Sequence, residues 1–152
     1  MRLAALSLLV LSLACAKKEE APPPDSVPAA VPAPPPAFSL ASAAGTWTYL
    51  AKTATGDTTL VTAELVATAD TTGWMLKLPN RKPIPLKVSV SGDSLMTSAG
   101  PYESVLRKGV KVTTEGVARM VDGKMMGTTT AHYSVKTADS VRHMITEATK
   151  KP

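Results

Sequence analysis

The chain contains a single cysteine, Cys15, and only two histidines, His132 and His143. A lone cysteine cannot close a disulfide within the chain, and it supplies no thiolate pair for a zinc or iron–sulfur site. The histidines do not lie in a metal-binding motif such as HExxH. The sequence therefore excludes a disulfide framework and predicts neither a resident metal nor another cofactor.

Aromatic residues make up only 4% of the chain, and its net charge is a mild +5. Proteins that bind single strands of nucleic acid need aromatic side chains on which bases stack, and they cluster their cations along one face. Here the cations are spread singly, with no run longer than a pair such as Arg81-Lys82 or Arg107-Lys108. We therefore expect no nucleic-acid partner.

Patterns that would carry catalysis are also scarce, because GxSxG, paired carboxylates and phosphate-binding loops are missing. One four-residue match exists: Gly92-Asp93-Ser94-Leu95 is similar to the motif of the GDSL esterases, and Asp139 and His143 follow near the C-terminus. Their spacing is DxxxH, whereas that family has DxxH on a longer α/β domain. A tight turn at Gly92-Asp93 explains the same residues. We predict no catalytic residues and no enzymatic activity.

The first 15 residues have the layout of an export signal: Arg2, an apolar run too short to span a bilayer, and small Ala14 before Cys15. Residues 11–15, LSLAC, resemble the lipobox of bacterial lipoproteins. The departure is Ser12, where that family has Leu, Val or Ile. The alternative is an ordinary secretory peptide that is cut after Ala14 or Ala16 and releases a soluble protein.

The lipobox resemblance implies that residues 1–14 are removed and that Cys15 is acylated, so that lipid chains anchor the protein to a membrane. Ala16 replaces the Asp that retains lipoproteins in the inner membrane of enteric bacteria, which implies the periplasmic face of the outer membrane. The rest of residues 15–37 contains most of the chain's 13 prolines and few groups to bury. We expect this segment to be a disordered, polyproline-like linker.

Residues 38–152 have the composition of an all-β domain, rich in Thr and Val and without a sustained helical period. Tight turns are predicted at Gly56-Asp57, Gly92-Asp93 and Asp122-Gly123, where Gly and Asp separate strand-like runs. A longer irregular connection is expected from 99 to 109. These breaks predict eight strands at about 45–54, 58–68, 74–79, 84–91, 94–99, 110–121, 124–136 and 139–149.

Eight antiparallel strands in sequence order form a meander, and closing the first strand onto the last removes its exposed edges. We therefore predict a small up-and-down β-barrel. Residues 84–90 show the clearest alternation, with Ile84, Leu86, Val88 and Val90 on one face.

The first predicted strand carries Gly45-Thr46-Trp47, which resembles the GxW signature of the lipocalins and related calycin barrels. This resemblance implies that Trp47 packs the barrel floor and that a basic residue near the last strand stacks on it, for which Arg142 is the nearest candidate. Trp47 as a core anchor of another small barrel or sandwich is the alternative. The chain also resembles small, uncharacterised bacterial lipoproteins that carry a Gly-Pro-Tyr-Glu-Ser loop.

Two functions stay open for such a barrel. In the first it binds a small apolar or amphipathic ligand in its mouth, where Trp47, Tyr102 and Arg107 are the candidate binding residues. In the second the barrel is filled by side chains, and its exposed loops contact envelope proteins or the cell wall. A soft-metal site at His132 and His143 would require the two to face each other across the last hairpin, and the poor turn chemistry of Thr137-Ala138 argues against it.

Overall fold

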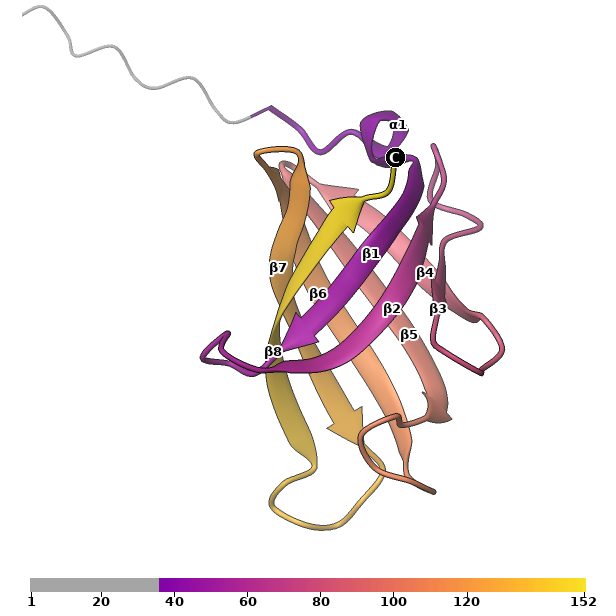
Figure 1. Cartoon of the computed structure of the whole chain (residues 1–152), viewed down its shortest axis with the longest axis vertical. Helices are drawn as coiled ribbons and strands as arrows, with labels where there is room; N and C mark the ends of the chain where they lie inside the picture. Colours follow the sequence, from indigo (N-terminus) through magenta and orange to yellow (C-terminus); the bar gives the residue numbers. More distant parts are fainter. Residues whose placement is uncertain (1–35) are drawn as a thin grey trace, which may run out of the picture. The chain divides into compact units, whose positions relative to one another are not determined.

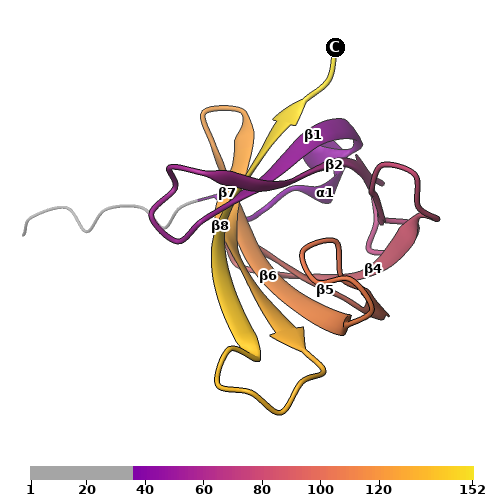
Figure 2. The same cartoon turned by 60° about the horizontal axis from the view of Figure 1, so that its bottom comes forward.

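A computed structural model describes residues 36–152, and the predicted antiparallel barrel is confirmed. The predicted signal peptide, Cys15 and all but the last two residues of the predicted linker lie outside the described residues. Eight strands form one closed sheet in sequence order, with β1 hydrogen-bonded to both β2 and β8. Figure 1 shows the barrel from the side, and Figure 2 shows the strands as a ring. No helix among these residues is long and apolar enough to cross a membrane.

The elements follow the predicted strands closely. A four-residue helix, α1, precedes the barrel, and every neighbouring pair of strands is antiparallel. The elements are α1 (Leu40–Ala43), β1 (Gly45–Lys52), β2 (Thr59–Ala67), β3 (Met75–Lys77), β4 (Ile84–Ser91), β5 (Ser94–Glu103), β6 (Lys111–Val121), β7 (Lys124–Tyr133) and β8 (Val141–Lys150).

The barrel has two distinct ends. The capped end holds α1, the start of β1, the C-terminus and the hairpin turns at Gly92-Asp93 and Asp122-Gly123 (Figure 1). Both turns have the predicted two residues, and Asp122 and Gly123 adopt the positive φ that such turns require. The loop end holds the connections 53–58, 78–83, 104–110 and 134–140.

Side chains that alternate along the strands fill the interior. The two tryptophans anchor the part of the core near the capped end. Trp47 and Trp74 are almost completely buried, together with Leu95 and the helix residue Ala43. A second cluster around Val112, Tyr133 and Met144 fills the loop end, and a third lies at the side of the barrel around Ala63, Leu78 and Ile84. Met120, near the end of β6, is exposed.

The tight turn predicted at Gly56-Asp57 is wrong, because these residues belong to a six-residue connection, 53–58. The ends of β5 and β7 depart furthest from the predicted strand boundaries. β5 continues to Glu103 instead of stopping at 99, because after a register shift Tyr102 and Glu103 still pair with Val112 and Lys111 of β6. β7 ends at Tyr133, so a longer loop joins it to β8. The irregular segment expected at 99–109 is therefore reduced to 104–110.

Candidate functional site

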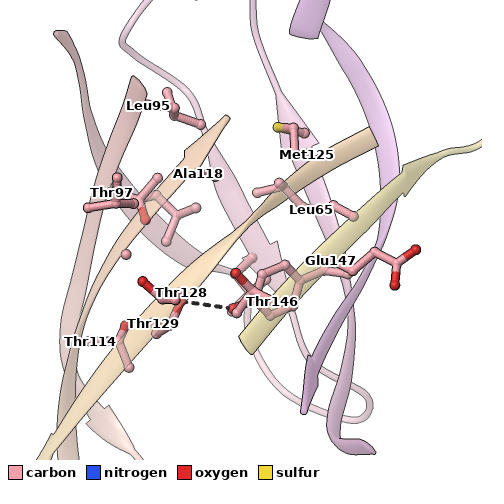
Figure 3. A pocket seen from close by; sticks show the side chains of 16 residues that line it. Leu65, Leu95, Thr97, Thr114, Ala118, Met125, Thr128, Thr129, Thr146 and Glu147 are labelled. Atoms are coloured by element: carbon pink, nitrogen blue, oxygen red, sulfur yellow. Dashed lines mark hydrogen bonds between the residues drawn. The ribbon is translucent and has the colours of Figure 1, made fainter. Parts of the chain in front are cut away.

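A small cavity lies in the middle of the barrel, with a volume of about 60 Å³. Threonine side chains from four strands converge on it, as Figure 3 shows for Thr97, Thr114, Thr129 and Thr146. A cavity of this size holds a few water molecules, whereas an engineered cavity that binds benzene has a volume of about 150 Å³. The barrel interior is thus filled, and threonine hydroxyls lie among the leucine and methionine side chains that also line this cavity.

The Tyr49 hydroxyl joins the four threonine hydroxyls, and together they form the polar belt. It lies 3.3 Å from the Thr129 hydroxyl (dashed line in Figure 3), and burial raises the pKa of Tyr49 to about 12. Gly116 makes the convergence possible, because a Cβ atom there would stand 2.8 Å from Thr97 Oγ1 and 3.0 Å from Thr129 Oγ1.

Trp47 helps to close the capped end of the barrel. Its indole Nε1 donates to the carbonyl oxygen of Ala43 in α1 at 2.8 Å. Lys150, from the last strand, places Nζ 5.5 Å from the centre of the Trp47 ring and donates to Ser42 O at 3.3 Å. Arg142, the expected partner of Trp47, was the wrong basic residue, because the register pairs Trp47 with Lys150 and places Arg142 opposite Ala131.

Tyr102 and Arg107 lie at the loop end. The Arg107 guanidinium stands 4.2 Å from the ring centre of Tyr133 and forms an ion pair with Asp139 at 2.7 Å. The ion pair and the hydrogen bond from Thr137 hold the pKa of Asp139 below its ordinary value, the hydrogen bond being the larger cause. Arg107 also donates to the carbonyl oxygen of Asp139. Through these contacts within the protein, Arg107 ties the 104–110 loop to the 134–140 loop.

The predicted binding residues therefore do not form one site. Trp47 is buried at the capped end, whereas Tyr102 and Arg107 pack around the cluster at the loop end. Of the three, Tyr102 lines a cavity large enough for a small molecule.

This larger cavity, the seam cleft, lies where β4 and β5 separate. The two strands pair from Ser91 and Ser94 down to Leu86 and Ala99, and beyond Ala99 the chain of β5 pairs only with β6. The cleft has a volume of about 610 Å³. Its walls combine apolar surface from Ile84, Leu86 and several prolines with polar groups, and its residues are Lys82, Pro83, Ile84, Pro85, Leu86, Lys87, Ser98, Ala99, Gly100, Pro101, Tyr102, Thr113, Thr114 and Glu115.

Tyr102 is the aromatic group of the seam cleft. Burial raises the pKa of its hydroxyl, although a hydrogen bond with Thr114 opposes that shift. Charged groups at the cleft are Lys82, Lys87 and Glu115. Sequence reasoning missed these three residues, because they come from the β3–β4 connection, β4 and β6 and share no motif.

Within residues 36–152, the other candidate metal-binding and catalytic residues do not form a site. His132 pairs with Val141 and His143 with Thr130, so the two histidines are offset by two residues and do not face each other. No three His, Cys, Asp or Glu side chains in this part of the chain are grouped as metal ligands. Ser94 donates to Asp93 and lies at the capped end, whereas Asp139 and His143 lie toward the loop end.

Comparison with protein-family models, curated proteins and solved structures finds no match to this chain.

Proposed function

We propose that this protein is a lipid-anchored lipoprotein of the bacterial cell envelope, and that its lipocalin-like barrel binds a small amphipathic ligand in the seam cleft. The proposed ligand binding rests on the seam cleft. Its volume of about 610 Å³ falls within the range of about 300–1,000 Å³ that is usual for small-molecule sites. Apolar walls beside polar and charged groups suit a ligand with both characters.

The closure of the capped end supports the lipocalin-like part of the proposal. The GxW resemblance implies a tryptophan on the barrel floor and a basic residue of the last strand stacked on it. Trp47 and Lys150 have this arrangement, and α1 covers them. The site differs from a ligand chamber inside the barrel, since the central cavity is only about 60 Å³.

A filled barrel that contacts another envelope protein is the second candidate. Met96 and Val117 favour it, because they lie opposite each other on the outer face of β5 and β6 and expose 39% and 47% of their surface. Exposed apolar side chains that adjoin each other are a common feature of protein-binding surfaces.

The membrane anchor is tested by Cys15→Ser. We expect the variant to lack the lipid and to move from the membrane fraction to the soluble fraction, because no apolar chain remains to hold it. Acyl labelling and fractionation of host cells measure both effects. Ser12→Leu, which improves the lipobox, should leave the anchoring intact, and an unchanged distribution of the Cys15→Ser protein would refute the proposed anchor.

Ligand binding in the seam cleft is tested by native mass spectrometry of the protein purified gently from its host envelope. We expect a non-covalent mass increment that disappears on denaturation. Ser98→Phe, which adds a ring at the cleft, should reduce the occupied fraction at least tenfold. Thr62→Phe adds the same ring on an exposed position of β2 outside the cleft and serves as the control. A bare mass for the wild type would favour the protein-binding alternative.

A further inference from the structure

The outer wall of the seam cleft carries a row of residues in direct register. Lys87 of β4 lies opposite Ser98 of β5, and Ser98 lies opposite Glu115 of β6. A second hollow of about 500 Å³ on the same strands shares these three residues with the cleft. A cation and a carboxylate thus stand on either side of a small hydroxyl residue, with open volume around them.

The charges at the cleft differ from most others on the barrel in having no partner. Elsewhere, Glu147 binds both Lys52 and Lys124, and Glu64 binds both Lys77 and Lys151. Within residues 36–152, no ion pair or side-chain hydrogen bond forms at the side-chain charges of Lys82, Lys87 or Glu115.

Lys87 and Glu115 lie on strands that are separated by β5. Neighbouring strands are separated by about 4.8 Å, so the backbones of these two residues lie about 10 Å apart, two strand spacings. Ser98 between them is too short to fill the space. A ligand that lies across β5 can therefore meet a positive group on one side and a negative group on the other.

We infer that the seam cleft takes a zwitterionic ligand of the short-peptide class. Its carboxylate lies toward Lys82 and Lys87, its ammonium group lies toward Glu115, and its middle covers Ser98 and the neighbouring apolar surface. A fatty acid or another simple anion would satisfy the lysines but would leave the Glu115 carboxylate close to its own charge. This inference rests on the proposed function, because it names the ligand of the same cleft.

The experiment titrates the mature, lipid-anchored protein in detergent with trialanine, N-acetyl-trialanine and trialanine amide, and follows the amide signals of Ser98 and Thr113 by NMR. We expect free trialanine to bind about fivefold more tightly than either blocked peptide, the upper limit for one exposed ion pair. The preference should weaken as salt is added, since exposed charges are screened.

Variants assign each end of the peptide. Glu115→Gln should remove the preference for the free amine and keep the preference for the free carboxylate. The double variant Lys82→Gln with Lys87→Gln should do the reverse. Asp122→Asn and Lys136→Gln change exposed charges outside the cleft and should alter neither preference.

Equal affinity for the free and blocked peptides, or variants without effect, would overturn the zwitterion assignment. If the cleft signals instead respond to decanoate and not to trialanine, the proposed amphipathic site stands and this inference fails. If they respond to neither probe and the protein leaves its host envelope without a bound molecule, both fail.

Discussion

Replacing Trp47 by alanine is expected to lower the free energy of unfolding by about 3–5 kcal/mol, the usual cost of truncating a buried aromatic side chain. Trp47 exposes only 1% of its surface and belongs to the buried cluster that includes Ala43 of α1 and Leu65 of β2. Its indole also holds α1 through the bond to Ala43 O. Urea denaturation followed by circular dichroism measures the loss, and removal of the cap should increase hydrogen exchange in residues 38–44.

Two further variants separate the contributions of the tryptophan. Trp47→Phe keeps an aromatic ring but loses the N–H donor, so we expect a smaller loss of about 1–2 kcal/mol. Lys150→Met keeps the aliphatic stem and removes the ammonium group over the ring, which should cost less than about 1 kcal/mol because Lys150 is exposed. A Trp47→Ala loss no larger than the Lys150→Met loss would show that the cap does not depend on the indole.

The parts of the fold that could be predicted are those with local causes. Gly92-Asp93 and Asp122-Gly123 supply the backbone conformations of two-residue turns, and the residues on both sides alternate, so the hairpins were readable from the sequence. Closure of the sheet followed from the need to remove its edges. Each of these inferences needed only neighbouring residues or the sequential order of the strands.

The errors arose where pairing between distant strands decides the outcome. Gly100-Pro101 has the sequence of a break, but β5 continues past it because β6 still offers pairing partners for Tyr102 and Glu103. Lys150 instead of Arg142 reaches Trp47 because of the register between β1 and β8, which no local pattern specifies.

The candidate site was predictable only in part, and for the same reason. Tyr102 was singled out by its place in an irregular segment that mixes aromatic and charged residues. The seam cleft exists because β4 and β5 separate below Leu86 and Ala99 while β5 stays paired with β6. Lys87 and Glu115 become neighbours of one cleft only through that arrangement, and single-strand periodicity shows them simply as outward-facing charges.

The second large effect is expected at Gly127, where the substitution of a single alanine should prevent stable folding. A Cβ atom at this position would stand 2.0 Å from Val117 O and 2.7 Å from Ala118 Cα, both backbone atoms of β6. Backbone within a closed sheet cannot move aside as a flexible side chain can. Overpacking typically costs about 1–3 kcal/mol, and we expect Gly127→Ala to exceed that range because β6 and β7 must separate.

Gly116→Ala is the matched control, because it adds the same methyl group to the neighbouring strand. Its closest contacts are the hydroxyls of Thr97 and Thr129, which can rotate away, so we expect a loss of only about 1–2 kcal/mol. Expression yield and urea denaturation of both variants provide the comparison. A larger loss at Gly127 would show that glycine is required there because the backbones of β6 and β7 approach closely. No alternation pattern in the sequence reveals this approach. Equal losses would instead mean that the threonine hydroxyls around Gly116 cannot rotate away. The constraint would then lie in the polar belt.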